Sequence, residues 1–360
     1  MDNPRKTVLI APLNWGLGHA NRLLPVIAAL RDDDCRVMVA ATSPALEVIQ
    51  QEFPELEIRP IKSSAIRYTR NRWLMPKLFV QAPVLLRDLL YERRWIKRYV
   101  QNEKPDLIIS DNRFGLYHKD VFSCYMTHQV KVIMPAYLKP FQPLVRWIHR
   151  KIIASYDVCL IPDGEQNGLS GKLAHQPKGF SFKHVYIGPV SGFLSLSPVP
   201  AEHIPDVLLV VSGPEPQRHM LVEKFADLFR NDSRELWIVA GQPHKKYDNR
   251  DNNIRIISHM RRAELKYLMM HVPVLILRSG YTSLMDLHAI KRKAILIPTP
   301  GQTEQEYLGQ YFQERYTFRV IQQNARMTAS DFSKAHCDTW MHDESQSMEN
   351  IRLKLKSIFR

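Results

Sequence analysis

A glycine-rich turn near the amino terminus carries the most suggestive group of reactive residues in the sequence. The segment Gly16-Leu17-Gly18-His19 follows an apolar run, and Arg22 lies three residues after His19. Glycines at a strand-to-helix turn let the main chain approach a ligand closely, and the amino terminus of the helix favours an anion. An imidazole there can accept a proton near neutral pH. The turn predicts a ligand site with His19 as a base, or else a tight turn in which His19 only caps the helix.

A carboxylate and a second imidazole also follow apolar runs. Asp111 comes directly after the run 106–110, and His128 and Gln129 lie farther along the same half of the chain. The carboxyl ends of parallel strands share one edge of a sheet, so we expect Asp111 to lie close to His19. A carboxylate beside an imidazole fixes its tautomer and raises its basicity. Asp111 is therefore predicted either to orient His19 or only to cap a turn.

Two polar segments in the second half could hold a phosphorylated ligand. Residues 278–283 read Arg-Ser-Gly-Tyr-Thr-Ser between an apolar run and a helical pattern, and Asp286 follows one turn later. Main-chain and hydroxyl groups at a helix start can donate to phosphate oxygens, and Asp286 could accept from ribose hydroxyls. The loop 298–306, Pro-Thr-Pro-Gly-Gln-Thr-Glu-Gln-Glu, follows the next apolar run. An ordinary helix cap and a polar surface loop are the alternatives.

The apolar pattern predicts the elements that must position these groups. Short runs rich in Val, Ile and Leu alternate with helical patterns, which is typical of a parallel sheet covered by helices on both faces. The predicted strands are 7–11, 36–41, 106–110, 131–135, 157–162 and 185–188, then 206–213, 235–241, 253–259, 272–280 and 293–300. Two basic residues precede 7–11, but the glycine-rich turn after it favours a strand over a signal peptide.

A proline-rich stretch divides the chain into two α/β units. It contains Pro189, Pro198, Pro200 and Pro205 with several serines, a composition typical of a linker. We predict one domain over 1–190, a second over 191–342, and a basic amphipathic helix within 343–360 that packs back on the first domain. Ligands of open α/β sheets bind outside the carboxyl ends of the strands, so the chemistry is expected in a cleft between the domains.

Composition narrows the class of partner. The chain has 360 residues, 45% of them hydrophobic, and a formal net charge of +14. The hydrophobic fraction argues against a mainly disordered chain, and no run reaches the roughly 18 apolar residues of a membrane-spanning helix. The charge suits a nucleotide, a nucleic acid or an acidic membrane face. The four cysteines are far apart without CxxC spacing, so we expect no zinc or disulfide framework and a cytoplasmic location.

Taken in order, these segments resemble the family 28 glycosyltransferases. That family includes the N-acetylglucosaminyltransferase that completes the lipid-linked peptidoglycan precursor. The resemblance is carried by the turn ending in His19, by Arg-Ser-Gly at 278–280, by Asp286, and by the loop containing Gln305. It implies a GT-B fold, an α/β architecture of two Rossmann-like domains whose parallel sheets face each other across a cleft. The first domain would bind the acceptor and the second a UDP-sugar donor, with no metal or cofactor bound.

The resemblance and the residue patterns together predict the site residues. His19 and Asp111 are predicted as the catalytic base and its orienting carboxylate. The predicted donor-binding residues are Gly213, Arg218, Ile257, Arg278, Ser279, Gly280, Tyr281, Thr282, Ser283, Asp286, Gln302 and Gln305. The predicted acceptor-binding residues are Asn14, Gly16, Gly18, Arg22, Arg113, His128 and Gln129. In the implied arrangement Asp286 holds the ribose, Ile257 meets the base through its main chain, and residues 279–283 lie near the diphosphate.

Several positions depart from the family pattern. The family loop Gly-Gly-Ser-Gln-Gly appears here as Ser-Gly-Pro-Glu-Pro-Gln-Arg at 212–218. Glu215 beside a diphosphate would be unfavourable, and Arg218 is the residue that could offset it. Glu306 stands where the family has a second glutamine, Asp286 replaces a glutamate, and the segment at 128–129 lacks the glutamate of the family's His-Glu-Gln. The sugar, either N-acetylglucosamine or a hexose, stays open.

A basic, aromatic segment predicts contact with a membrane surface. Between residues 62 and 98 there are ten basic and two acidic residues, interleaved with Trp, Tyr, Phe and Leu, and 141–151 is similar. Such segments suit the interface of an anionic bilayer, although a helix packed on its own core is the alternative. No RNA- or DNA-binding module is recognisable, so we expect no nucleic-acid partner.

Three functions remain open at this point. The leading one is an inverting, metal-independent glycosyltransferase that moves a sugar from a UDP-sugar to a hydroxyl of a lipid-linked or cell-envelope glycan, at the inner face of the cytoplasmic membrane. The second is a nucleotide-sugar hydrolase, because Gly-Leu-Gly-His-x-x-Arg also resembles the loop of a UDP-sugar hydrolase of related fold, in which the histidine activates water. The third is a non-catalytic nucleotide-sugar-binding protein.

Overall fold

The structure, a computed structural model, describes residues 5–14, 16–62, 82–175, 182–213, 215–342 and 347–358. Its amino-terminal half is built on a seven-stranded parallel sheet with the order β3-β2-β1-β4-β5-β6-β7. These strands are β1 Thr7–Pro12, β2 Arg36–Ala41, β3 Glu57–Pro60, β4 Leu107–Asp111, β5 Phe122–Met126, β6 Val158–Ile161 and β7 His184–Tyr186. The central strands are buried on both faces, as the apolar runs predict.

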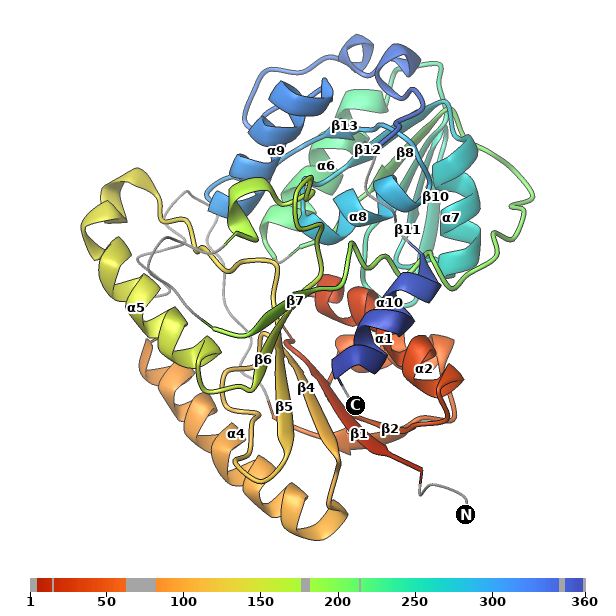
Figure 1. Ribbon diagram of the computed structural model, residues 1–360. Coiled ribbons are helices and arrows are strands. Elements are labelled where there is room, and N and C mark those ends of the chain that lie inside the picture. The colour runs from red at the N-terminus through yellow and green to blue at the C-terminus, as the bar shows by residue number, and fades with distance from the viewer. Residues whose placement is uncertain are drawn as a thin grey trace.

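The carboxyl-terminal half contains a second, six-stranded sheet with the order β10-β11-β9-β8-β12-β13. Its strands are β8 Val207–Val210, β9 Leu236–Val239, β10 Asp248–Asp251, β11 Ile254–Ile257, β12 Val274–Leu277 and β13 Ile295–Leu296. All neighbours are parallel except β10 and β11, which form an antiparallel edge. Figure 1 shows the two α/β units one above the other, with the long connection after β7 running between them.

Helices cover the two sheets, and the turns at their amino ends carry several of the predicted site residues. In the first half they are α1 Leu17–Asp32, α2 Ala45–Glu52, α4 Ala82–Glu103 and α5 Gln142–Ile153, with the short 3-10 turns η1 Ala136–Phe141 and η2 Gly171–Leu173. In the second half they are α6 Gln217–Phe229, α7 Arg262–His271, α8 Tyr281–Ala289, α9 Thr303–Tyr316 and α10 Met348–Ile358, with η3 Ala329–Asp331 and η4 Lys334–His336. Within the described residues, no helix is long and apolar enough to cross a bilayer.

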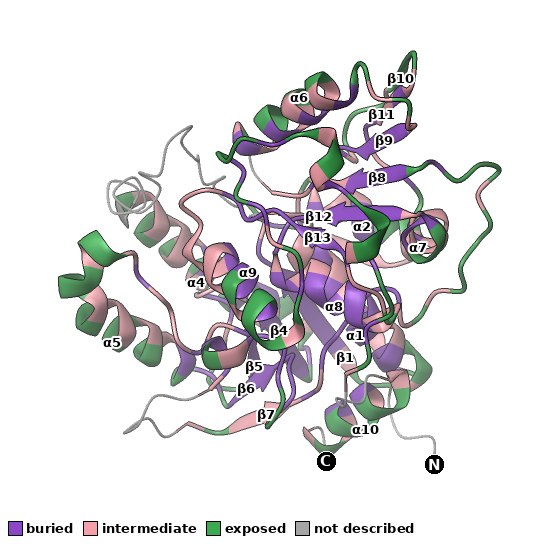
Figure 2. Ribbon diagram, turned by 90° about the horizontal axis from the view of Figure 1, so that it is seen from above, coloured by how far each residue is buried: buried purple, intermediate pink, exposed green. Residues whose placement is uncertain are grey.

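Helix α1 is the element shared by the two halves. It buries Leu23, Leu24, Ile27 and Leu30 in a core that also includes residues of the second sheet (Figure 2). It packs against α8 of the second half and against α10, the last helix of the chain. Asp33, just after α1, accepts a hydrogen bond from Arg352 at 2.5 Å and pairs with Lys356 at 2.9 Å. The chain therefore returns to its first domain at its carboxyl end.

The predicted strand at 131–135 is wrong. The neighbour of β4 is instead β5, whose sequence Phe-Ser-Cys-Tyr-Met mixes polar and apolar residues although four of its five side chains are buried. The segment 131–135 is a connection between elements. Its main chain bonds to the Gln142 side chain, which accepts from Met134 N and donates to Val132 O, instead of to a neighbouring strand. The edge strands β3 and β10, both short and polar, were also not predicted.

Candidate functional site

A cavity lies between the two halves, at the carboxyl ends of their strands. Its wall contains residues of the glycine-rich turn and α1, of the loops after β8 and β9, and of the first turns of α8 and α9. Of the residues predicted from the sequence, it is lined by Gly16, Gly18, His19, Arg22, His128, Gly213, Gly280, Tyr281, Thr282, Ser283, Asp286, Gln302 and Gln305. The structure thus gathers both the turn and the 280–286 segment at one site.

His19 and Asp111 lie side by side, as the strand-end argument predicts. His19 Nδ1 is 3.2 Å from Asp111 Oδ2, with Asp111 fully buried at the end of β4 and His19 19% exposed at the cavity. Arg22, one turn further along α1, is 2% exposed and reaches the same carboxylate. Its Nε donates to Asp111 Oδ2 at 2.8 Å, and its Nη2 makes a second, short contact to Asp111 Oδ1. The carboxylate is therefore held in a two-pronged ion pair.

Arg22 also contacts the imidazole of His19, in competition with Asp111. Its Nη2 lies 2.9 Å from His19 Nδ1. A guanidinium only donates, so His19 Nδ1 either accepts from Arg22 or donates to Asp111, and cannot do both. Only the second arrangement leaves Nε2 unprotonated and able to take a proton from a ligand in the cavity. The base form of His19 is thus available, but in competition with its neighbour.

The polar network continues from Arg22 into the other half of the molecule. Arg22 Nη1 donates to His128 Nδ1 at 2.9 Å, which places the imidazole proton on Nε2. His128 Nε2 lies 3.0 Å from Glu304 Oε1, and Gln129 Nε2 donates to the other carboxylate oxygen of Glu304. The ring of Tyr281 stacks on His128 with 4.2 Å between ring centres. A carboxylate on α9 is thereby connected to the group around His19.

Burial and charge shift the acidity of these groups. Burial lowers the pKa of His19 below its ordinary 6.5; Asp111 opposes this and Arg22 adds to it. Burial acts to raise the pKa of Asp111, but Arg22 and His19 together, through charge and hydrogen bonds, outweigh it and hold that pKa below its ordinary value. The pKa of Glu304 is likewise lowered, since His128 and Arg22 outweigh burial. At neutral pH the site therefore combines two carboxylates, a guanidinium and an uncharged His19.

The amino terminus of α8 forms the opposite wall. Gly280 precedes the helix in an extended conformation, and Tyr281, Thr282 and Ser283 form its first turn beside the cavity. Thr282 Oγ1 donates to Gly18 O at 3.3 Å, so the two glycine-containing turns approach each other closely. A helix start with free main-chain N–H groups attracts anions. This wall can bind phosphate oxygens opposite His19.

Asp286 lies deeper on the same helix and has a basic neighbour that the sequence analysis did not single out. It is half-buried at the cavity wall, desolvation raises its pKa, and it accepts from Ser191 Oγ at 2.5 Å. Arg262, at the start of α7, lines the same cavity and interacts electrostatically with Asp286. Arg262 also donates to Asn21 Oδ1 at 2.7 Å, across the two halves. Together these groups make the most polar end of the cavity.

Three predicted donor-binding residues turn away from the cavity. The buried Arg278 guanidinium donates to Gln217 O, Ile297 O and the Gln323 side chain, so it braces the second sheet. The Ile257 carbonyl accepts from Ala240 N at 2.8 Å and is used in the sheet; His259, two residues later, lines the cavity instead. Arg218 does pair with Glu215, at 2.7 Å, as the loop sequence suggests, but does not line the cavity.

Four other predicted residues have structural contacts outside the cavity wall. Ser279 Oγ donates to Gln305 O at 2.7 Å, and Asn14 donates to Ser43 O. Gln129 reaches Glu304, as described above. Arg113 is 1% exposed, pairs with Glu92 at 2.8 Å, and donates to the carbonyls of Pro12 and Lys62. Its guanidinium therefore anchors α4 to the first sheet rather than facing a ligand.

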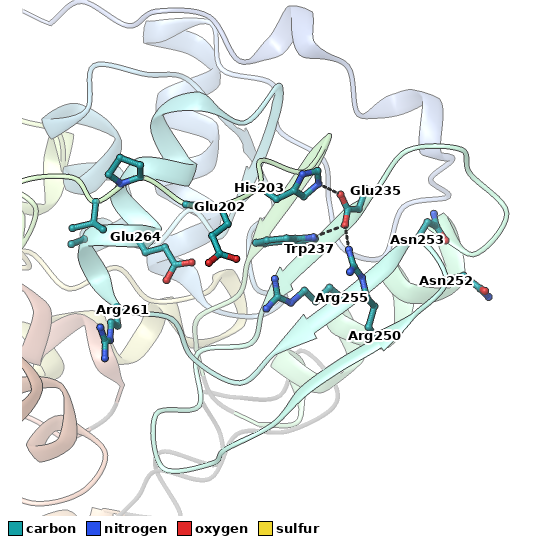
Figure 3. Close-up of a pocket in the computed structure, with 14 residues that line it drawn as sticks. Glu202, His203, Glu235, Trp237, Arg250, Asn252, Asn253, Arg255, Arg261 and Glu264 are labelled. Carbon is teal, nitrogen blue, oxygen red and sulfur yellow. Dashed lines mark hydrogen bonds and ion pairs between the residues drawn. The ribbon is translucent and has the colours of Figure 1, made fainter.

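A second groove lies on the outer side of the carboxyl-terminal half (Figure 3). Several of its polar groups bond to each other: Glu235 accepts from Trp237 Nε1 at 2.9 Å and from Arg250 at 2.7 Å, and the Arg255 guanidinium lies over the Trp237 ring. Over the described ranges, no group of three or more His, Cys, Asp or Glu is arranged to hold a metal ion.

Solved structures match the chain over nearly its whole length, whereas no protein-family model and no curated protein matches its sequence. The glycotransferase of kitacinnamycin superposes with a TM-score of 0.58 at 13% identity, covering 99% of this chain and 91% of that one. The calicheamicin glycosyltransferase CalG4 gives 0.56 at 12%, with 99% and 90% covered. The spinosyn rhamnosyltransferase SpnG gives 0.56 at 13%, with 98% and 91% covered. The predicted GT-B fold is confirmed; such low identities show the fold alone.

Proposed function

We propose that this protein is an inverting glycosyltransferase of the family 28 type, which transfers a sugar from a UDP-sugar to an acceptor hydroxyl without a bound metal. The observation that carries the proposal is the cavity in which the His19–Asp111 pair faces the amino terminus of α8. One wall offers a proton acceptor and the other a site for a diphosphate. A glycosyl transfer needs both, because a proton must leave the acceptor while charge develops on the leaving phosphate.

In the proposed reaction the donor lies along the second half of the molecule. The main-chain N–H groups at 281–283 receive the diphosphate, and Asp286 accepts hydrogen bonds from the ribose hydroxyls. Gly213, with a φ of +106°, lets its loop run close to the ligand. Gln302 lines the cavity, and its buried Oε1 has no hydrogen-bond partner in the described structure, so it can accept from a sugar hydroxyl. We propose N-acetylglucosamine or another hexose as that sugar.

The proposed chemistry is a single displacement. His19 Nε2 takes the proton of the acceptor hydroxyl while that oxygen forms a bond to the anomeric carbon. The bond from this carbon to the phosphate oxygen breaks on the opposite side, and UDP leaves with the electron pair. The configuration at the anomeric carbon is inverted. Asp111 holds the Nδ1–H tautomer of His19 and stabilises the imidazolium that forms.

An exposed apolar surface supports an acceptor at a membrane. Five large side chains around η1 and α5 are between 45% and 56% exposed: Tyr137, Phe141, Leu144, Trp147 and Ile148. Lys139, Arg146, Arg150 and Lys151 lie among them in sequence. Figure 2 shows α5 at the outer edge of the molecule. We propose that this surface, here named the α5 patch, docks on anionic lipid and brings a lipid-linked or cell-envelope glycan acceptor to the cavity.

In the rest of the predicted basic segment, some apolar side chains are exposed and others are buried. Leu86 and Leu90 of α4 are 56% and 49% exposed, whereas Ile96 is fully buried and Trp95 packs on the core. The carboxyl-terminal part of α4 is therefore an ordinary packed helix. Residues 63–81, which hold most of the predicted aromatic side chains, lie outside the described part of the chain.

A donor screen tests the proposed function. The purified protein would be incubated with UDP-, GDP- and TDP-sugars, with and without lipid extract, while nucleotide release and sugar transfer are followed. We expect UDP release that depends on the extract and a product of inverted configuration. Release of free sugar without an acceptor would show a hydrolase. Tight binding of a UDP-sugar without turnover would show a binding protein.

A further inference from the structure

The charges buried around His19 do not balance. Asp111 and Arg22 form a close two-pronged pair, so the charge of Asp111 is already compensated. Glu304 is the other carboxylate of the network. It bonds to His128 and Gln129, which bring no permanent positive charge. With His19 and His128 uncharged, the network carries one net negative charge, and that charge belongs to Glu304.

The negative charge of Glu304 makes protonation of His19 more favourable. When the acceptor proton moves to His19 Nε2, the network passes from one net negative charge to zero. Without the carboxylate of Glu304 it would pass from zero to one net positive charge in a buried site. Uncompensated charge is costly in a medium of low dielectric constant, so the second process is much less favourable. Asp111 contacts the imidazole directly, but Arg22 shares both of its oxygens, so Asp111 compensates the new charge only in part.

We propose that Glu304 is a positioning residue for His19, acting across the cleft through His128 and Arg22, and that it supplies the negative charge that lets His19 accept the acceptor proton. This inference rests on the proposed function. The connecting gaps are 3.0 Å from Glu304 to His128, and 2.9 Å both from His128 to Arg22 and from Arg22 to His19. Each is a hydrogen-bond distance.

Because of the position of Glu304, the proton affinity of His19 depends on how close the two halves of the molecule lie. Glu304 belongs to the first turn of α9, in the donor-binding half, whereas His128, Arg22 and His19 all belong to the other half. The neighbouring Thr303 Oγ1 donates to Ile133 O at 3.0 Å, which ties this helix start to the first half. When the halves part, Glu304 leaves the network. His19 is then a weaker base, and water is less readily activated against a bound donor.

The other titratable groups near the network come from each element packed around it. The charged ones are Asp111 from the end of β4, Arg22 from α1, and Asp286 with Arg262 at the far end of the cavity; the others are His128 from the loop after β5, Tyr281 from α8, and His259. Of these, Asp286 and Arg262 interact with each other. Removing the charge of Glu304 alone therefore isolates its effect on His19.

The substitution Glu304→Gln removes the charge and keeps the shape. A nearby negative charge favours imidazolium, so its loss makes His19 release its proton at lower pH. We expect the acid limb of the pH dependence of kcat to move to lower pH and kcat at its plateau to fall by about tenfold, as for a base weakened by about one pKa unit. The KM for the donor should stay unchanged. Glu304→Asp, which keeps the charge, should restore part of the rate.

Glu314→Gln is the matched control, because Glu314 is an exposed carboxylate on the same helix and accepts a hydrogen bond from Gln310. A raised donor KM in E304Q with an unmoved acid limb would overturn the inference, since Glu304 would then be a substrate-binding residue. A ¹⁵N NMR titration of His19 needs no turnover and tests the inference even if no donor reacts. An unchanged His19 titration in E304Q would contradict it. If E304Q does not fold, Glu304→Ala, which removes the same charge without placing an amide there, must move the acid limb in the same direction.

Discussion

At the scale of single residues, the proposed role of His19 as a base depends on one ring nitrogen. His19 Nδ1 has Asp111 on one side at 3.2 Å and Arg22 on the other at 2.9 Å. Asp111 favours the tautomer that acts as a base, and Arg22 favours the tautomer that donates from Nε2. The proton affinity of His19 is thus set by burial, Asp111 and Arg22 together rather than by a simple His–Asp pair.

The pH dependence follows from the direction of the His19 shift. Burial, with Arg22, lowers the pKa of His19 below 6.5 despite Asp111, so less than half of the imidazole is protonated at pH 6.5. A base works while it is unprotonated, so we expect the midpoint of the acid limb of kcat to lie below pH 6.5. A pH-rate profile under saturating donor measures this. A midpoint above pH 6.5 would contradict the described surroundings of His19.

Substitution of Arg113 distinguishes a structural role of this residue from a role in acceptor binding. Its removal by Arg113→Ala leaves Glu92 buried without its cationic partner, and breaking such a pair costs about 3–5 kcal/mol. We expect the free energy of unfolding, measured by urea denaturation, to fall by about that amount, while the donor affinity of the folded protein is kept. Arg218→Ala, which breaks the partly exposed pair with Glu215, serves as the control and should cost less than about 1 kcal/mol. Unchanged stability with lost acceptor affinity would restore the role predicted from the sequence.

At the scale of elements, the starts of α1 and α8 nearly touch. A Cβ atom on Gly18 would lie 2.8 Å from Thr282 Oγ1, closer than such contacts allow. Gly18→Ala should therefore push the two turns apart and lower kcat/KM by about tenfold, which corresponds to about 1.4 kcal/mol.

A double-mutant cycle identifies the cause of that loss. In the Thr282→Ala background the obstructing hydroxyl is gone, so adding Gly18→Ala should have little further effect. If Gly18→Ala lowers kcat/KM equally in both backgrounds, the close approach of α1 and α8 is not what requires glycine at this position.

The α5 patch gives a second prediction at this scale. Leu144 and Trp147 are 51% and 56% exposed, and each would bury its apolar surface in a lipid interface. Burying a side chain of this kind contributes roughly 1.5–3 kcal/mol, so Leu144→Ser or Trp147→Ser should weaken binding to anionic vesicles by about tenfold or more. Vesicle sedimentation measures this. Met341→Ser, at an apolar residue that is 74% exposed elsewhere, is the control. Equal losses in the control would argue against a specific docking surface.

At the scale of the whole molecule, the sequence predicts the fold better than the site. Both sheets, and the meeting of His19 with Asp111, follow from apolar runs and from the rule that parallel strands end at one edge. The prediction of a strand at 131–135 was wrong because the Gln142 side chain, rather than a neighbouring strand, bonds main-chain groups of this segment. The more polar segment 122–126 forms the strand of the sheet instead. Apolar periodicity cannot detect such an exchange.

The site residues that were missed or misplaced share a physical reason. Arg278 looked like a phosphate ligand, but the direction of its side chain depends on carbonyl groups far away in the sequence. Glu304 was overlooked because its partners lie on the other half of the chain, 176 and 175 residues away. No spacing rule places two domains relative to each other.

The most direct test of the central claim compares the wild type with His19→Ala for two quantities, UDP-sugar affinity and the rate of sugar transfer. A base at the cavity wall contributes to the reaction and not to holding the nucleotide, so we predict that donor affinity stays within about twofold while transfer falls by about 10²-fold or more. Loss of affinity and of transfer in the same proportion would show that His19 binds the donor. Unchanged transfer would contradict the account of this cavity as the active site of a glycosyltransferase.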